Sequence, residues 1–289
     1  MTVPGWPVAF RGSHAIEAGL VTRGRLRGPR FRRVLPDVYC RACAEPDLLL
    51  RSLAAYRLVE GRGVLSGYSA ALLLDAACAP RPDVPAEVTV VGDLRAHRGL
   101  AVHRDRLLDG EITSVRGIVC TDPVRTAFDL ARRPDRDGSV VAVDRLANRH
   151  RFHPERLLEL HDRHRGCRGA TRVPGVVALA SPYTGSPMET RLRLLIVDAG
   201  LPCPEVQWIV QDRATRTAFW LDLAWPALKI GIEYEGEPHT EPQRVLRDIA
   251  RHTRLVALGW RVYRYSKLDV YGNPGRIVAE LARARSRST

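Results

Sequence analysis

Apolar and polar residues alternate most regularly in the segment FWLDLAWPALKIGIEYEGEPH, which spans positions 219 to 239. The alternation predicts two strands joined by a turn, because successive side chains of a strand point to opposite faces. On the second strand Glu233 and Glu235 share one face, about 6–7 Å apart along the strand. On the first strand Leu221 and Leu223 are expected on one face and Asp222 on the other. If the two strands pair, Asp222 converges on the two glutamates.

Three carboxylates on one face of an otherwise apolar sheet repel one another unless a positive charge lies between them. A hard divalent cation with oxygen ligands, Mg²⁺ or Mn²⁺, is the simplest candidate for that charge. The alternative is that the acids are strand-edge residues that face solvent. That alternative explains one acid well, but it explains three acids flanked by apolar runs less well.

The segments on either side of this hairpin have the periodicity of helices. Ser186 and Glu189 have the spacing of a capping box, and Pro187 suits the first helical position, so a helix is predicted from there to Gly200. A longer helix is predicted from residue 241 to residue 258. Its apolar face is expected to lie on the sheet and comprises Val245, Ile249 and Val256.

The same long helix carries Arg244, Asp248 and Arg251 at positions i, i+4 and i+7. This spacing places the three charged side chains on one face of the helix. A ladder of surface ion pairs explains the pattern, and each such pair contributes only about 0.3 kcal/mol. The functional alternative is that Arg251, together with Arg244, faces a bound phosphate group.

The first 45 residues are predicted to form a compact basic module. Short helical stretches at 14–18 and 23–27 precede strands at 31–35 and 38–40, which is the element order of a winged helix. Arginines crowd the second helix and the hairpin. Those expected to contact DNA are Arg23, Arg25, Arg27, Arg32 and Arg33. The alternative is a small hairpin module whose arginines only face solvent.

The remaining pattern divides the chain further. Residues 46–175 predict a middle region of mixed helices and strands, and no catalytic constellation is evident in it. A stretch rich in Gly, Pro, Ser and Arg follows, with residues 176–185 expected as a linker before the domain at 186–289. The expected fold class is therefore α/β (α+β), in three parts.

Composition adds a strong positive charge. The 45 basic residues exceed the 32 acidic residues by 13, and all but two of the basic residues are arginines. Such an excess favours polyanionic partners, above all nucleic acid, whereas the alternative is a generally arginine-rich surface. The N-terminus lacks the pattern of a signal peptide, and no run of about 18 apolar residues occurs, so a cytoplasmic protein without a membrane partner is expected. The six cysteines are scattered, and the spacing of Cys40 and Cys43 lacks the second ligand pair of a zinc site.

The order of the C-terminal elements resembles that of the PD-(D/E)XK nuclease superfamily, and more narrowly its very-short-patch-repair-like branch, DUF559. The resemblance covers about residues 186–284. Its motifs are Ser186–Glu189, Asp222, the run from Glu233 to Gly236 followed by His239, Asp248 with Arg251, and Leu258–Trp260 leading to Arg264. The usual lysine of the superfamily is replaced by Glu235, as in the DUF559 branch, so a lysine-assisted mechanism is not implied.

This resemblance implies a restriction-endonuclease-like mixed sheet flanked by helices, and metal-dependent hydrolysis of phosphodiester bonds in DNA. The implied ligands of Mg²⁺ or Mn²⁺ are Glu189, Asp222, Glu233 and Glu235. Glu189 is explained equally well as a helix cap, and the two roles are compatible. The implied catalytic residues are Asp222, Glu233, Glu235, His239 and Arg251, with His239 as a general base or a phosphate contact. Arg244 is implied as a DNA contact.

The front half resembles a second family, the AbiEi-type antitoxins. The run EAGLVTRGRL…FRRVLPDVY resembles their N-terminal domain, and LSGYSAALLLDA and CTDPVRTAFDLAR resemble their second domain. This leaves an alternative function open: a non-catalytic DNA-binding transcriptional regulator that uses the nuclease-like fold as a scaffold. A toxin partner is open under that alternative, and a homodimer under either. An RNA-processing nuclease ranks last, because no aromatic platform for RNA bases is evident.

Overall fold

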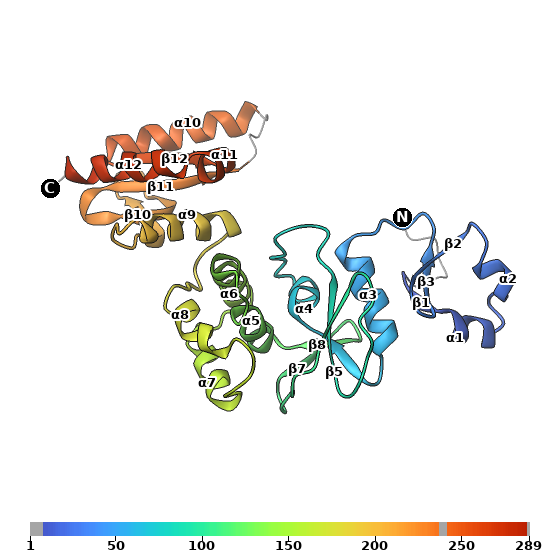
Figure 1. Ribbon diagram of the computed structural model, residues 1–289. Coiled ribbons are helices and arrows are strands. Elements are labelled where there is room, and N and C mark those ends of the chain that lie inside the picture. Colours follow the sequence, from blue (N-terminus) through green and yellow to red (C-terminus); the bar gives the residue numbers. More distant parts are fainter. Residues whose placement is uncertain (1–7, 237–241, 288–289) are drawn as a thin grey trace. The chain divides into compact units, whose positions relative to one another are not determined.

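The computed structural model describes residues 8–236 and 242–287. In the helix that begins at Pro242, side chains are described from Leu246 onward. The chain divides into two compact units, Met1–Val177 (unit 1) and Ala178–Thr289 (unit 2). The described residues form three sheets with helices packed against them, which confirms the mixed α/β fold class (Figure 1).

Unit 1 begins with a small three-stranded sheet of order β1-β3-β2. Its elements are β1 (Phe10–Arg11), α1 (Gly12–Glu17), α2 (Arg23–Leu26), β2 (Phe31–Leu35) and β3 (Val38–Arg41). The hairpin of β2 and β3 lies where the alternation predicts it. The second helix is shorter than expected, only 4 residues long, and its start is capped by the Thr22 side chain. Arg11 donates hydrogen bonds to the carbonyl oxygens of Arg57 and Leu58, which fastens this sheet to the middle region.

The middle region is built on a five-stranded sheet of order β6-β5-β4-β8-β7. Its elements are α3 (Leu48–Val59), β4 (Gly63–Leu65), α4 (Gly67–Leu73), β5 (Ala86–Val90), β6 (Leu100–His103), β7 (Ile112–Val115) and β8 (Ile118–Thr121). Every residue of β5 is buried. The helices that complete unit 1 are α5 (Pro123–Ala131), α6 (Arg136–His150), α7 (Arg156–Arg163) and α8 (Val173–Val177), with the 3-10 turn η1 (Ala170–Arg172) before α8.

Unit 2 contains a four-stranded mixed sheet of order β12-β11-β10-β9, in which only the β11–β12 pair is parallel. Its strands are β9 (Glu205–Asp212), β10 (Thr217–Trp225), β11 (Ile230–Glu235) and β12 (Arg261–Ser266). Its helices are α9 (Pro187–Asp198), α10 (Pro242–Ala257), α11 (Lys267–Gly272) and α12 (Pro274–Ser286), and the 3-10 turn η2 (Pro226–Leu228) joins β10 to β11.

Two hydrophobic layers cover this sheet. On one side, residues of α9, α11 and α12, including Leu192 and Ile277, pack on Ile230 and Ile232. On the other side, Leu255 of α10 packs in a second cluster of buried residues. The sheet is thus covered on both faces by hydrophobic residues.

Strand β10 changes the face to which its side chains point at Asp222. Leu221 packs on the α10 side together with Ala224, whereas Leu223 packs on the α9 side. The pairing of β10 with β9 omits Asp222 and Gln207, and Gln207 has the left-handed φ of 53°. The prediction that Leu221 and Leu223 share a face is therefore wrong, because simple alternation requires an unbroken ladder.

Helix α10 also turns a different side to the sheet than its apolar pattern predicts. Leu255 is fully buried, whereas Ile249 is 58% exposed and Val256 is 54% exposed. The prediction that Ile249 and Val256 face the sheet is wrong, and the side chain of Val245 lies outside the described residues. The helix is oriented by Leu255, which is buried, and by Arg251, which donates a hydrogen bond to Glu233 of β11.

Candidate functional site

Asp222 lies where strands β10 and β11 separate. The two strands pair only over Leu223–Trp225 on the β10 side. Beyond that point, Oδ2 of Asp222 accepts a hydrogen bond of 2.9 Å from the backbone N–H of Tyr234. The carboxylate thus replaces a backbone acceptor at the end of the ladder, and this bond fixes its position.

Glu189 comes to the same place from the first turn of α9. The Ser186 hydroxyl accepts a hydrogen bond from the backbone N–H of Glu189 at 3.2 Å, so the helix begins as the motif predicts. The Glu189 carboxylate accepts from the N–H of Gly185 at 2.9 Å and from Nε2 of Gln207 at 3.0 Å. It is only 8% exposed. Gln207 therefore supports the site, and nothing in the sequence pattern indicates this role.

Glu233 is held by two arginines on the α10 side of the sheet. Nη1 of Arg251 donates to Oε2 of Glu233 at 3.1 Å, and its Nη2 donates to the other carboxylate oxygen and to the carbonyl oxygen of Trp220. Nε of Arg264 lies 3.4 Å from Oε2 of Glu233. Arg251, predicted to face a phosphate, is engaged with a carboxylate here, so Glu233 carries little uncompensated charge.

The electrostatic surroundings of Asp222 are different. Burial, and then the nearby carboxylate of Glu189, raises the pKa of Asp222 to about 7. Glu233 adds to this shift, whereas the Tyr234 N–H and Arg251 oppose it. An Asp at this position therefore carries its negative charge at an energetic cost, and a cation placed beside it would reduce that cost.

Glu235, the remaining predicted ligand, lies in a more exposed position. The side chain of Glu235 is 58% exposed at the end of β11, with Nη1 of Arg264 4.0 Å from its carboxylate. His239 and the side chain of Arg244 lie outside the described residues. The structure thus brings together Glu189, Asp222 and Glu233 of the predicted ligand set.

The carboxylates present suit Mg²⁺ in a limited way. This ion is usually held by one or two carboxylates together with water and substrate phosphates, and Glu189 and Asp222 can supply two. Glu233 is occupied by Arg251 and Arg264. Within residues 8–236 and 242–287, no group of three or more His, Cys, Asp or Glu side chains forms a metal-binding cluster. The geometry fits a two-carboxylate site completed by a substrate phosphate better than a closed four-ligand cage.

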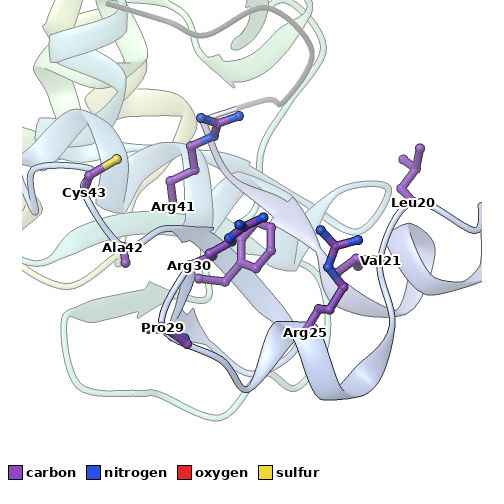
Figure 2. A pocket seen from close by; sticks show the side chains of 9 residues that line it. Leu20, Val21, Arg25, Pro29, Arg30, Arg41, Ala42 and Cys43 are labelled. Carbon is purple, nitrogen blue, oxygen red and sulfur yellow. The ribbon is translucent and has the colours of Figure 1, made fainter.

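Of the predicted DNA contacts of the N-terminal module, Arg25 lines a second feature, a hollow of about 510 Å³. Figure 2 shows three arginines around it, Arg25 from α2, Arg30 from the turn before β2 and Arg41 from the end of β3. Leu20 and Phe31 give the hollow an apolar part. Arg41 was not among the predicted contacts, because its approach to Arg25 depends on the pairing of the strands.

The other predicted arginines of this module differ in their availability. Arg23 and Arg27 are exposed beside the hollow. Arg32 donates to the carbonyl oxygen of Ala44 at 3.0 Å and is partly buried, so it holds the chain after β3 in place. Arg33 is exposed and donates to the carbonyl oxygen of Leu35. The arginines available to a polyanion are thus Arg23, Arg25 and Arg27 of the predicted set, together with Arg30 and Arg41.

Comparisons with known proteins place the chain beside two mycobacterial sequences. No protein-family model matches it. It is 31% identical over 271 residues to the uncharacterized protein Rv2248 of Mycobacterium tuberculosis strain H37Rv, an alignment that covers 89% of this chain and 93% of the relative. The uncharacterized protein MT2308 of strain CDC 1551 matches to the same extent. Among the described residues, no helix has the length and apolar character needed to cross a bilayer. By its identity and coverage, the chain belongs to the family of these two mycobacterial proteins.

Proposed function

We propose that unit 2 is a Mg²⁺-dependent endonuclease domain of PD-(D/E)XK type, close to the DUF559 branch, that hydrolyses phosphodiester bonds in DNA. The observation that carries the proposal is the position of Asp222, a partly buried carboxylate placed beside Glu189 where strands β10 and β11 separate. A partly buried acid whose pKa is raised by burial and by a second carboxylate is typical of functional sites.

In this proposal the chain supplies a two-carboxylate site and nearby cations. Asp222 and Glu189 would hold the ion, which when bound polarises the phosphate and lowers the pKa of a water molecule. Arg251 keeps Glu233 neutralised, so that the excess negative charge is confined to Asp222 and Glu189. The hollow with Arg25, Arg30 and Arg41 would contribute DNA affinity through its positive charge.

The test compares Asp222→Asn with wild-type protein on supercoiled plasmid and single-stranded DNA, with Mg²⁺ or with EDTA. Glu205→Gln is the matched control, because Glu205 is an exposed acid of the same sheet. Cleavage should fall to background with EDTA and in Asp222→Asn, and it should persist in Glu205→Gln. DNA binding, measured by gel retardation, should be unchanged in all three proteins.

A second arm measures the ion without any reaction. Four of the five tryptophans, Trp208, Trp220, Trp225 and Trp260, belong to unit 2, so their fluorescence during urea unfolding reports on that unit. Mg²⁺ that binds the folded unit should raise the unfolding midpoint of wild-type protein and leave that of Asp222→Asn unchanged. Equal cleavage by wild-type protein and Asp222→Asn, or no effect of Mg²⁺ on either midpoint, would overturn the proposal.

One observation favours a second candidate, a non-catalytic DNA-binding regulator of AbiEi type. Both oxygens of Glu233 are occupied by Arg251 and one also by Arg264, which closes one of the expected ligand positions. A scaffold that only binds DNA would keep such an ion pair for stability. This candidate predicts retarded but intact DNA in every lane and sequence-specific binding, with a toxin protein or a second copy of the chain as further partners.

A further inference from the structure

A cavity of about 460 Å³ opens in the middle region of unit 1. Its wall is formed by residues from separate elements, among them Ser66 before α4, Glu87 of β5, His103 of β6 and Arg172 of η1. Its volume lies within the range of about 300–1,000 Å³ that is usual for small-molecule sites. The sequence indicated no site here, since these residues are spread over more than 100 positions.

One side of the cavity is built around the carboxylate of Glu87, which is only 3% exposed. This carboxylate accepts a hydrogen bond from the backbone N–H of Tyr68 at 3.1 Å, lies 2.9 Å from Nε2 of His103 and pairs with Arg133. Gly67, with a φ of 52°, makes this possible, because a Cβ there would lie 2.4 Å from a Glu87 oxygen. The Glu87 contacts therefore leave it as a fixed part of the wall rather than as an open acceptor.

Another part of the lining is a cluster of arginines anchored by acids. Arg132 pairs with both Asp105 and Asp129, which also pair with the fully buried Arg125 behind them. Five arginines but only three carboxylates line the cavity, so positive charge is in excess. Arg172, an exposed residue of the lining, adds a guanidinium whose Nη1 donates to the carbonyl oxygen of Arg132 at 3.3 Å. The cavity is thus suited to an anion.

Two donors of residues that line the cavity have no hydrogen-bond partner among the described residues. The Ser66 hydroxyl is buried, with the residue 1% exposed, and it does not cap the helix that follows it. Nε of Arg132 is likewise buried and unpaired. Buried donors are seldom left without an acceptor, because the unpaired group has lost its hydration. A ligand with several acceptor oxygens would satisfy both.

We propose that this cavity binds the phosphate group of a small ligand of about mononucleotide size. Phosphate oxygens accept from hydroxyl and guanidinium donors, and planar guanidinium groups contact them in pairs. Ser66 and Arg132 would donate to the phosphate, Arg172 would close over it, and the apolar surfaces of Val102 and Pro134 leave room for an uncharged part. The site does not depend on the carboxylates of unit 2.

The test is isothermal titration calorimetry of the full chain with adenosine 5′-monophosphate, inorganic phosphate and adenosine. We expect the first two to bind and adenosine not to bind. Ser66→Ala and Arg172→Gln should each weaken the binding of the monophosphate about tenfold, the usual effect of losing one charge-assisted hydrogen bond. Arg163→Gln, which changes an exposed arginine outside the cavity, is the matched control and should bind as wild type.

A second measurement separates ligand binding from folding. Because the Ser66 hydroxyl has no partner in the part of the protein that the structure describes, Ser66→Ala should unfold at the same urea concentration as wild type or at a higher one. Wild-type affinity for the monophosphate in both Ser66→Ala and Arg172→Gln would overturn the proposal. So would displacement of the monophosphate by an oligonucleotide without terminal phosphates, which would assign the site to a nucleic-acid backbone. Asp222→Asn should bind the monophosphate normally, so failure of the nuclease proposal and failure of this one are distinguishable.

Discussion

Each unit contains a cluster of buried or partly buried carboxylates, and the two clusters are balanced in opposite ways. In unit 1 the guanidinium of Arg125, 1% exposed, lies 2.5 Å from Glu111 and 3.0 Å from Asp129. Arg132 joins Asp129 to Asp105. In this network every acid has an arginine partner, whereas Asp222 of unit 2 has a second carboxylate as a close neighbour.

The pKa values follow this difference. Burial disfavours ionisation of Glu111, but hydrogen bonds from His164, the N–H of Leu108 and Arg125 outweigh it and lower the pKa of Glu111. Burial and Glu189 instead raise the pKa of Asp222. The comparison teaches that burial of a carboxylate does not by itself decide whether its pKa rises or falls, because the neighbouring charges decide it. The paired acids of unit 1 stabilise the folded state. The charge of Asp222 destabilises folded unit 2, and a bound cation would reduce that cost.

The largest expected effect comes from breaking the balanced network. Arg125→Met would leave the buried Glu111 with His164 as its remaining charged partner and would remove one of the two arginine partners of Asp129. Loss of one member of a buried ion pair costs about 3–5 kcal/mol. Hydrogen exchange followed by peptide mass spectrometry should show loss of protection in α5 and in neighbouring strands of unit 1. Peptides of unit 2 serve as the internal reference. A loss of less than about 1 kcal/mol would mean that the network contributes no more than surface pairs do.

A smaller effect of opposite sign is expected from Asp222→Asn. An Asp ionises near pH 3.8 when unfolded but near pH 7 here, so Asp222 reduces the stability of unit 2 progressively as pH rises between these values. The amide keeps an acceptor for the Tyr234 N–H and removes the charge. We expect Asp222→Asn to be more stable than wild type at pH 8 by about 2–4 kcal/mol, with the gain vanishing below pH 4.

Urea unfolding followed by tryptophan fluorescence at several pH values measures this gain. Glu205→Gln is again the matched control and should show the wild-type pH dependence. A variant that is less stable than wild type at pH 8 would contradict the assignment of an unbalanced charge to Asp222.

The smallest effect is expected at an exposed pair. Arg57 and Glu60 form a 3.0 Å ion pair within one helix turn, with side chains 38% and 45% exposed. Arg57→Gln should therefore change the stability of unit 1 by less than about 0.5 kcal/mol. The same hydrogen-exchange measurement used for Arg125→Met checks this. A large loss of protection in Arg57→Gln would show that burial does not explain why the Arg125 network contributes more stability than this exposed pair.

Much of unit 2 was predictable because its signals are local. The cap at Ser186 and the alternation around Glu233 depend on residues a few positions apart. The helix begins where the sequence indicates, and the strand, expected from Leu228, begins at Ile230. The approach of Asp222 to Glu233 follows from the short hairpin. The occupation of Glu233 by Arg251 could not be predicted, because helix periodicity favoured burial of Ile249 and Val256 instead.

The middle region shows the opposite case. Its helices and strands follow ordinary patterns, yet the cavity that joins Ser66, Glu87, His103 and Arg132 has no signature in the sequence. These residues come from four separate segments, and each is unremarkable in its own segment. Their proximity is a product of sheet order, which places β5 between β4 and β6 and cannot be read from neighbouring residues.

The change of face at Asp222 limits how the length of this chain can vary. Leu221 belongs to one hydrophobic layer and Leu223 to the other, so removing or adding one residue between them would bring the wrong side chains to both layers at once. An ordinary strand can lengthen at its ends without this consequence, because the register of its paired residues does not change. Natural insertions and engineered labels would be tolerated far better in the exposed turn at residues 213–216, where β9 passes into β10.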